Sequence, residues 1–530
     1  MLLELLTGQG AQVPSGAASL EIASLAVDSR AVRPGALFAA FRGVADDGAR
    51  FVPQAVAAGA VAVLCDRKLD CAPAVCVVAA DPRRTFARAA SRFHGDPSSQ
   101  LKLLGVTGTN GKTTTSYLVE QLAAALGERA GVIGTIEQRW PGHARPAAHT
   151  TPESHDLQAT LAAMVGAHVD VAALEVSSHA LAQHRPDGCR FAAAAFTNLT
   201  RDHLDYHQTL EAYFDAKARL FRELLEPGAP AVLNLDDPRL AALAEELAKS
   251  GRRVIGFTVQ GARAPRGVSL LSAEGLTVSL AGLKFSLRAE RTAHHHGAPD
   301  APAQRLEVES PLLGAHNAEN LLAAIGLLTG GAGAPLQLLA RLAGEAHGAP
   351  GRMERVADPA AGRIILVDYA HSDDALARAL DAVTVAAAAS PGTRVICVFG
   401  CGGDRDQGKR PLMGRAARAR AFLTVATSDN PRTEDPLSIL AQIEQGLARA
   451  GEKALAPLAA KQGAPGYLIV PDRREAIALA LACARPGDVV LIAGKGHETV
   501  QIVGAEKRPF DDRREATEAL SRLARPEGAK

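Results

Sequence analysis

Short apolar runs alternate with amphipathic stretches over the last third of the chain. The runs are bounded by polar or glycine-rich residues, as in buried strands, and the stretches between them have helical spacing. The predicted strands are 363–369, 394–400, 422–428 and 488–494, and the predicted helices are about 373–387, 411–421, 436–450 and 473–484. This alternation predicts a Rossmann-like, mostly parallel α/β sheet.

Glycine and charged residues follow each of those four runs directly. The segments are DYAHS, GCGGDRDQGKR, SDNPRTEDP and GKGHE. Ligands of open α/β sheets bind beyond the carboxyl ends of the strands, so these loops predict one shared site. Four ordinary polar loops are the alternative.

A second α/β pattern lies earlier in the chain. A strand-like run at 101–106 leads through a glycine-rich turn into a helical pattern that ends at Gly127. Further strand-like runs lie at 169–176, 191–199 and 229–235, with helical stretches between several of them. This pattern again predicts a mostly parallel sheet.

Two polar segments rich in glycine and proline, 94–100 and 344–355, indicate domain boundaries. A chain of 530 residues suggests about three domains. We therefore predict domains at 1–98, 99–346 and 347–530.

Two further segments are interpreted separately. Residues 291–305 lack periodicity, and their three histidines have no carboxylate or cysteine at metal-ligand spacing, so we expect a solvated loop. The longest uncharged stretch, 321–340, contains three glycines and a proline. It predicts a buried helix, a turn and a second helix rather than a membrane span, and we expect no membrane insertion.

The composition restricts the possible partners and the compartment. Lys plus Arg number 58 and Asp plus Glu 57, which argues against a basic protein that coats nucleic acid, and we expect no nucleic-acid partner. The seven cysteines include no CxxC pair, and the first ten residues resemble no signal peptide. We therefore expect reduced thiols and a cytoplasmic location.

The segment GVTGTNGKTTT, residues 105–115, is the strongest local motif. It lies where a predicted strand becomes a helix, so its backbone N–H groups can surround a phosphate. Lys112 can reach the β and γ oxygens, and the Thr113 hydroxyl can ligate Mg²⁺. The candidate phosphate-binding residues are Gly108, Thr109, Asn110, Gly111, Lys112, Thr113 and Thr114. A glycine-rich turn that binds no nucleotide is the alternative.

Glu175 and His203 follow strand-like runs of the same segment. A hard carboxylate oxygen and an imidazole suit a magnesium site beside phosphates. Core groups with satisfied hydrogen bonds are the alternative, and the neighbouring phosphate motif favours function.

Together these motifs resemble the Mur ligase superfamily, ATP-dependent amide-forming enzymes of peptidoglycan synthesis. The resemblance rests on GTNGKTT, EVSSH and TNLTRDHLDYH, and on DNPR and GKGHE in the last segment. It covers the whole chain except residues 291–305 and 457–466, which are interpreted as insertions. It implies an N-terminal uridine-nucleotide-binding domain, a central P-loop domain and a C-terminal Rossmann-like domain. It also implies a monomer that uses ATP and Mg²⁺ to add meso-diaminopimelate to UDP-N-acetylmuramoyl-L-alanyl-D-glutamate through an acyl phosphate.

The resemblance also assigns residues. For catalysis and metal binding it implies Lys112, Thr113, Glu175, His203 and Lys217, the last as a carbamate. For ATP it adds Asn234, His316, Asn317, Asp368 and His371. For the UDP substrate it implies Val27, Ser29, Val44, Ala45, Asp46, Thr150, Thr151, Ser177, Gln183 and Arg185. For diaminopimelate it implies Arg405, Asp429, Asn430, Pro431, Arg432, Gly494 and Glu498.

Other functions remain open at this point. They include a lysine-adding or D-Ala-D-Ala-adding ligase, folylpolyglutamate synthetase, a P-loop switch or motor, and a nucleotide-sugar binding protein. Arg432 favours diaminopimelate over lysine, because diaminopimelate carries an extra carboxylate that a guanidinium can bind through two hydrogen bonds.

Overall fold

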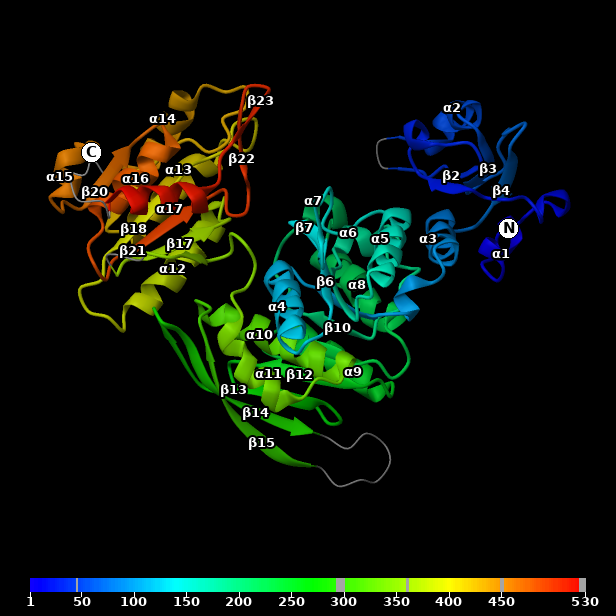
Figure 1. The fold of residues 1–530 in the computed structure, drawn as a ribbon, viewed down its shortest axis with the longest axis horizontal. Coiled ribbons are helices and arrows are strands. Elements are labelled where there is room, and N and C mark those ends of the chain that lie inside the picture. The colour runs from blue at the N-terminus through cyan, green and yellow to red at the C-terminus, as the bar shows by residue number, and fades with distance from the viewer. Residues whose placement is uncertain (44–45, 292–300, 359–361, 449–451, 524–530) are drawn as a thin grey trace. The chain divides into compact units, whose positions relative to one another are not determined.

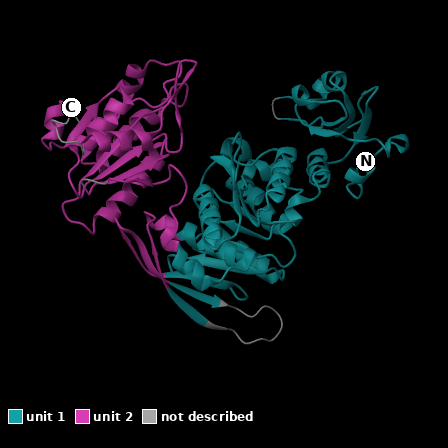
Figure 2. Cartoon of the chain, in the orientation of Figure 1, with its two compact units in different colours: residues 1–273, 287–306, 319–342 teal, residues 274–286, 307–318, 343–530 magenta. Residues whose placement is uncertain are grey.

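The computed structural model describes the whole chain except residues 44–45, 292–300, 359–361, 449–451 and 524–530. The chain forms two compact units (Figure 2). Unit 1 comprises residues 1–273, 287–306 and 319–342, and unit 2 comprises residues 274–286, 307–318 and 343–530. None of the helices in the described ranges combines the length and apolar character that crossing a membrane requires.

Unit 1 begins with a small parallel sheet in the order β1-β2-β3-β4 (Figure 1). Its strands are Ser24–Ala26, Ala36–Ala39, Ala60–Cys65 and Val75–Val78, and its helices are α1 Leu2–Leu6, α2 Val52–Ala57 and α3 Pro82–Phe93. Alternate residues of the strands face opposite sides. Leu37 and Leu64 pack with Phe86 of α3, whereas Phe38 and Val63 pack with Val52 of α2.

The second sheet has eleven strands in the order β15-β14-β13-β12-β11-β10-β5-β9-β6-β7-β8. The bounds are β5 Lys102–Thr107, β6 Ala130–Ile133, β7 Glu137–Trp140, β8 His143–Pro146, β9 Val171–Glu175, β10 Ala193–Phe196, β11 Ala231–Asn234, β12 Val254–Thr258, β13 Ser269–Ser279, β14 Gly282–Arg291 and β15 Ala301–Ser310. The central strands, in the order β13-β12-β11-β10-β5-β9-β6, are parallel to one another. At the edge, β7 pairs antiparallel with both β6 and β8. The parallel order predicted from the apolar runs is therefore confirmed.

Helices lie between these strands, and α10 and α11 follow β15. They are α4 Lys112–Ala125, α5 Ser154–Gly166, α6 Ser178–Ala182, α7 Leu204–His207, α8 Leu210–Arg219, α9 Pro238–Lys249, α10 Ala315–Leu327 and α11 Leu336–Leu342. The predicted helix, turn and second helix over 321–340 are confirmed by α10 and α11.

The prediction of a loop over 291–305 is wrong where the structure describes it. Residues 301–305 belong to β15, and the predicted loop residues 292–300 lie outside the described part of the chain. The sequence APAQRLEVES mixes polar and apolar residues, because β15 is an edge strand with exposed positions such as Arg305 and Glu307. Such a strand lacks the apolar run by which buried strands are recognised.

The sheet of unit 2 has the order β16-β17-β21-β18-β19-β20, with only β16 antiparallel to its neighbour. The strands are β16 Glu354–Val356, β17 Ile364–Asp368, β18 Val395–Phe399, β19 Leu423–Ala426, β20 Gly466–Ile469 and β21 Val489–Ala493, beside a ribbon of β22 Val500–Val503 and β23 Glu506–Pro509. The helices are α12 Asp373–Ala387, α13 Lys409–Arg420, α14 Pro436–Leu447, α15 Pro457–Lys461, α16 Arg473–Cys483 and α17 Asp512–Leu523.

Helices cover both faces of this sheet. One core contains Leu380 of α12, Met413 of α13 and Ile443 of α14. The opposite core contains Ile477 of α16 and Leu520 of α17. The double-sided burial explains why its strands are continuous apolar runs, and the predicted Rossmann-like α/β arrangement is confirmed.

Candidate active site

The phosphate loop connects β5 to α4. Gly108 and Gly111 have φ of +145° and +86°. A Cβ at Gly108 would lie 2.0 Å from Thr197 Oγ1, and a Cβ at Gly111 would lie 2.3 Å from Asn320 Oδ1. Both positions therefore require glycine, and the loop presents its backbone N–H groups at the start of a fourteen-residue helix.

Residues after β10 hold this loop in place. The backbone N–H of Thr109 donates to the Asn198 carbonyl at 2.9 Å, and that of Asn110 donates to Asn198 Oδ1 at 2.9 Å. Thr197 Oγ1 donates to the Asn110 carbonyl at 2.5 Å. Sequence reasoning quoted the segment TNLTRDH but gave Thr197 and Asn198 no role, because their contacts lie almost ninety residues away along the chain.

The Lys112 side chain folds back over the loop. Its Nζ donates to the carbonyls of Gly108 and Thr109 at 2.8 and 2.9 Å. Thr113 and Thr114 are buried in the first turn of α4. The ammonium thus lies at the loop whose backbone N–H groups can surround a phosphate.

Glu175, the last residue of β9, is fully buried beside the phosphate loop. Its carboxylate accepts from Thr113 Oγ1 at 3.0 Å and from both the N–H and the hydroxyl of Thr135 at 2.9 Å. A Cβ at Gly134 would lie 2.0 Å from Glu175 Oε1. Sequence reasoning missed Gly134 and Thr135, although the short segment IGT at a strand end was a possible signal.

The side chains beside the phosphate loop include oxygen donors suited to Mg²⁺. The described residues contain no group of three or more His, Cys, Asp or Glu side chains arranged around a metal. Thr113 and Glu175 nevertheless place two hard oxygen donors 3.0 Å apart beside the loop. Since protein-bound Mg²⁺ usually takes one or two side chains together with phosphate oxygens and water, this donor set fits Mg²⁺ beside a nucleotide.

His203 lies next to a second histidine, His179. Its ring centroid is 4.8 Å from that of His179, and its side chain is 47% exposed. Its backbone has a φ of +51°.

Lys217 of α8 is 1% exposed and lies under the phosphate loop. Its Nζ donates to the Gly108 carbonyl at 2.9 Å and lies 4.6 Å from the centre of the Tyr213 ring. Burial, and then the neighbouring Lys112, lower the pKa of Lys217 well below its ordinary value. The amine therefore loses its proton far more easily than a surface lysine does.

A hydrogen-bond network surrounds the end of β9. Thr151 Oγ1 donates to the Glu175 carbonyl at 2.7 Å and accepts from the N–H of Ser177 at 3.0 Å. Arg185 donates to the Thr151 carbonyl at 2.9 Å and to Gln183 Oε1 at 2.8 Å. The structure thus brings these four predicted substrate residues to the same strand end as Glu175, and Thr150 joins them through Thr135 at 3.1 Å.

The N-terminal part of unit 1 contains a cavity of about 560 Å³. The predicted residues Val27, Ser29 and Asp46 line it together with Arg83 and Glu153. The predicted residues Val44 and Ala45 lie outside the described part of the chain. A cavity of this size accommodates a small molecule.

In unit 2, Arg432 lies in the loop after β19 and contacts the loop after β18. Its guanidinium donates to the Gly403 carbonyl at 2.7 Å, and its backbone has a φ of +52°. Asn430 donates through Nδ2 to Glu498 Oε2 at 2.9 Å. A Cβ at Gly494 would lie 3.6 Å from Asp429 Oδ2.

Pro431 lies between Asn430 and Arg432, and its carbonyl would lie 1.9 Å from a Cβ at Gly403. Arg405 donates to the carbonyl of Asp404, a neighbour in the chain, at 3.4 Å. The structure thus places the residues predicted to bind the amino-acid substrate at one edge of the sheet, as expected for the carboxyl ends of parallel strands.

The remaining residues assigned to ATP divide between the units. In unit 1, Asn234 Nδ2 donates to the Thr197 carbonyl at 2.9 Å, next to the phosphate loop. In unit 2, Asp368 accepts from the N–H groups of Met353 and Ala370, both at 2.8 Å, and His371 is exposed. His316 and Asn317 lie in the first turn of α10, where His316 is exposed and Asn317 is buried.

Three family models match successive segments of the chain. The model of the Mur ligase family, catalytic domain, matches residues 21–92, that of the Mur ligase middle domain matches 106–328, and that of the Mur ligase, glutamate ligase domain, matches 351–496. A protein of Synechococcus sp. (strain WH7803), named UDP-N-acetylmuramoyl-L-alanyl-D-glutamate–2,6-diaminopimelate ligase, is 45% identical over 530 residues, covering 97% of this chain and 98% of that protein. The chain belongs to the Mur ligase family.

A second relative and two solved structures are also similar to this chain. A protein of the same name from Geobacter metallireducens (strain ATCC 53774 / DSM 7210 / GS-15) is 43% identical over 517 residues, covering 96% of each chain. A solved structure of a ligase with that name has a TM-score of 0.68 at 35% identity, covering 95% of this chain and 96% of the other. The folylpolyglutamate synthase of Thermotoga maritima, at 15% identity and a TM-score of 0.55, shares the fold.

Membership of the Mur ligase family confirms the predicted class of enzyme, an ATP-dependent ligase that forms amide bonds. All seven cysteines are free in the structure.

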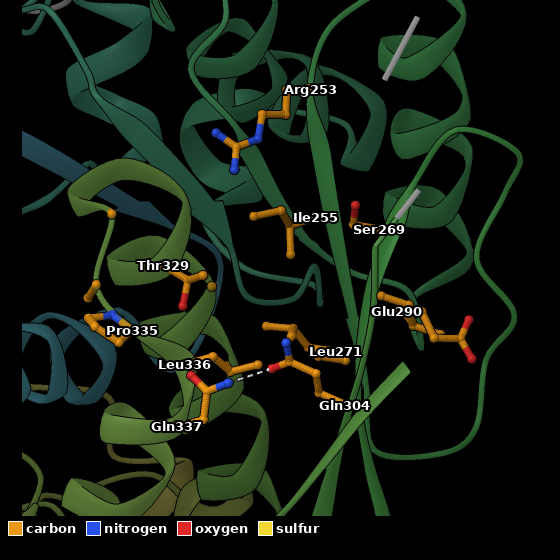
Figure 3. Close-up of a pocket in the computed structure, with 15 residues that line it drawn as sticks. Arg253, Ile255, Ser269, Leu271, Glu290, Gln304, Thr329, Pro335, Leu336 and Gln337 are labelled. Atoms are coloured by element: carbon orange, nitrogen blue, oxygen red, sulfur yellow. Dashed lines mark hydrogen bonds between the residues drawn. The ribbon is translucent and has the colours of Figure 1, made fainter. Parts of the chain in front are cut away.

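A further cavity of this Mur ligase, about 640 Å³, contains none of the predicted site residues. Ile255 and Leu271 face Pro335 and Leu336 across it (Figure 3). Its residues Arg253 and Ser269 lie at the amino ends of β12 and β13, whereas the phosphate loop follows the carboxyl end of β5. We therefore assign the chemistry to the phosphate loop and not to this hollow.

Proposed function

We propose that this Mur ligase joins meso-diaminopimelate to the D-glutamyl γ-carboxylate of UDP-N-acetylmuramoyl-L-alanyl-D-glutamate, with conversion of ATP to ADP and phosphate. The relatives that share 45% and 43% of their residues with the chain carry the name of that ligase. The observation that carries the choice of amino acid is that the loop bearing Arg432 is joined to the loop bearing Glu498 in unit 2, through the bond that Asn430 donates to Glu498.

The chemistry requires a carboxylate and a phosphate to approach each other. The γ-phosphoryl group passes to the carboxylate oxygen and leaves ADP. The amine then attacks the acyl phosphate, the C–N bond forms, the C–O bond to phosphate breaks, and one amine proton is released to solvent. Lys112 offsets the repulsion between these anions. Thr113, Glu175 and His203 would hold Mg²⁺, which supplies further positive charge at the phosphates when it is bound.

We also propose that Lys217 carries a carbamate. Its lowered pKa favours the neutral amine, which can add to CO₂ with loss of one proton to give an N-carboxylate. The carbamate would turn a cation that repels a metal into an oxygen ligand.

The UDP-linked substrate is assigned to unit 1. The cavity at Ser29 and Arg83 would take the uridine nucleotide, and the network of Thr151, Ser177 and Arg185 would hold the peptide end. Arg185 would bind a substrate carboxylate through its guanidinium. We place the reaction in the cytoplasm and expect a monomer.

The amino-acid pocket is assigned to unit 2. Arg432 and Arg405 would bind the carboxylate at the far end of diaminopimelate, and Asp429, Asn430 and Glu498 would bind its ammonium. Lysine lacks that second carboxylate, so Arg432 would add nothing to the affinity for lysine.

A product assay tests the proposal. The protein receives the UDP-muramoyl dipeptide and ATP, with meso-diaminopimelate or lysine in separate reactions, and the product is identified by mass. We expect the tripeptide with diaminopimelate. In Arg432→Ala the KM for diaminopimelate should rise by about tenfold or more, as expected for a lost bidentate pair. Arg522→Ala, which removes an exposed arginine of α17, is the matched control.

Three outcomes would overturn the proposal. A lysine-containing product would move the enzyme to the lysine-adding group, and unchanged discrimination in Arg432→Ala would remove the pocket assignment. Strong phosphate release from ATP without either cosubstrate would favour a P-loop switch.

A further inference from the structure

Lys495 is a fully buried lysine in the loop that follows β21. Its side chain has no exposed surface. The loop is the GKGHE segment, in which Gly494 and Glu498 are assigned to the amino-acid pocket and Lys495 has no role so far. A buried ammonium is stable only when it is paired, so its partners indicate its purpose.

Three oxygens of the amino-acid pocket surround this ammonium. Its Nζ donates to Glu498 Oε2 at 2.9 Å and to Asn430 Oδ1 at 3.0 Å, and lies 3.5 Å from Asp429 Oδ1. Asp429 Oδ1 is buried and accepts no hydrogen bond from the described residues. The three N–H groups of one ammonium thus face three residues that are assigned to the substrate.

Lys495 also determines the orientation of the Asn430 side chain. The oxygen Oδ1 receives Lys495 Nζ and, at 2.9 Å, the backbone N–H of Ile502. Because both partners can only donate, the carboxamide oxygen must point toward them. The NH₂ group must therefore point toward Glu498, to which it donates at 2.9 Å.

Lys495 supplies one positive charge to the two carboxylates of Asp429 and Glu498. The nearby buried cation, Arg473, is paired with Asp512 and donates to the Ala493 carbonyl. Without Lys495 the two carboxylates would repel each other, and the charge of Arg473 also acts on both of them.

We propose that Lys495 is a positioning residue for the amino-acid substrate. It does not touch the substrate, because it is enclosed. It fixes the carboxamide of Asn430, holds the carboxylates of Asp429 and Glu498, and offsets the repulsion between them. This inference rests on the proposed function, because it takes the pocket around Arg432 as the amino-acid site.

The test compares Lys495→Met and Lys495→Gln with the wild-type enzyme in steady-state kinetics. Lys495→Met removes the charge and the donors at similar length, and the KM for the amino acid should rise by about 10- to 100-fold, as for other residues that orient ligand-binding groups. Lys495→Gln keeps an N–H donor without the charge, so its KM for the amino acid should lie between those of the wild-type enzyme and Lys495→Met. The KM values for ATP and for the UDP substrate should stay within about twofold.

Arg394→Met is the matched control. Arg394 forms a buried ion pair with Asp488 in the same unit, at the amino end of β21 and away from the pocket. Its loss should lower the thermal midpoint without moving the KM for the amino acid. A merely structural role of Lys495 would give the same pattern as this control and would overturn the proposal.

Other outcomes are equally decisive. An equal rise of all three KM values would show a general defect and reject a positioning role. If Lys495→Met does not fold, an unchanged KM for the amino acid in Lys495→Gln rejects the positioning role of Lys495. If the wild-type enzyme uses lysine instead of diaminopimelate, the proposed substrate fails, while the Lys495 test proceeds with the amino acid that is used.

Discussion

Gly134 leaves just enough room for the Glu175 carboxylate. A Cβ at this position would lie 2.0 Å from Glu175 Oε1 and 2.8 Å from its Cδ. Gly134→Ala must therefore displace the carboxylate from Thr113 and Thr135. We expect kcat to fall on the order of 10²-fold, the scale of a displacement of about 1 Å at a reacting centre.

The control for this substitution is Gly166→Ala at the end of α5. A Cβ there meets nothing within 4 Å, so kcat and the thermal midpoint should both remain close to wild type. Full activity of Gly134→Ala would show that catalysis does not depend on the present position of the Glu175 carboxylate.

Lys217 has the properties of an amine that can be carbamylated. It is buried and its pKa is depressed, first by burial and then by Lys112. We expect the rate to fall in buffer freed of CO₂ and to recover when bicarbonate is added. Lys217→Met should have little activity and no response to bicarbonate, measured as ADP formed per minute. A wild-type rate that is independent of CO₂ would contradict the carbamate.

At the level of elements, Arg410 of α13 connects the two loops that present Arg405 and Arg432. It is fully buried and donates to both oxygens of Glu434, at 2.8 and 2.9 Å, and to the Gly402 carbonyl at 3.2 Å. The fork geometry of a guanidinium permits all these bonds at once. The loops after β18 and β19 are therefore fixed to each other through one side chain.

Arg410→Met should loosen both loops. The free energy of unfolding should fall by about 2 kcal/mol, less than for a fully buried pair because Glu434 is 21% exposed. The KM for the amino acid should rise as well, because Arg432 loses its fixed support. Urea unfolding and steady-state kinetics measure the two effects. An unchanged KM in a destabilised variant would show that the clamp serves stability alone.

The elements differ in how far the sequence predicts them. Buried parallel strands such as β18 and β21 are continuous apolar runs, and their predicted ranges contain the observed ones. Strands such as β8 and β23 are exposed at every residue, so no apolar pattern marks them. An exposed strand is specified by its partner rather than by its own sequence.

The same distinction applies to the site. The phosphate loop could be predicted from local chemistry, because its glycines and Lys112 are neighbours in the chain. The role of Lys495 could not, because Asn430 lies 65 residues away and only the fold brings them together. Lys217 was assigned through the family resemblance alone, and its burial gives that assignment a physical basis.

At the scale of the whole molecule, the chemistry divides between the units. Unit 1 contains the phosphate loop, Glu175 and the N-terminal cavity, and unit 2 contains the pocket around Arg432. Each unit places its polar residues at the carboxyl ends of parallel strands, so the same sheet geometry underlies both of the proposed substrate sites.

Stability should depend on pH through His497 of unit 2. Its ring centroid lies 4.8 Å from that of Tyr369, and its Nδ1 is buried without a hydrogen-bond partner among the described residues. Burial, and then the charges of Arg352 and Arg513, lower the pKa of His497 to about 4. In the unfolded chain its pKa is near 6.5, so between those values the unfolded state binds more protons than the folded state.

The free energy of unfolding should therefore fall as the pH drops from about 6.5 toward 4. His497→Phe keeps a ring beside Tyr369 and removes the titrating group, so the variant should lose less stability than wild type between pH 7 and pH 5. His207 in unit 1, with its pKa lowered to about 4 chiefly by burial, acts in the same direction and should leave part of the loss in place. Thermal midpoints of both proteins at the two pH values measure this difference. Equal losses would mean that the His497 ring is accessible to protons in the folded state, which its burial beside Tyr369, Arg352 and Arg513 argues against.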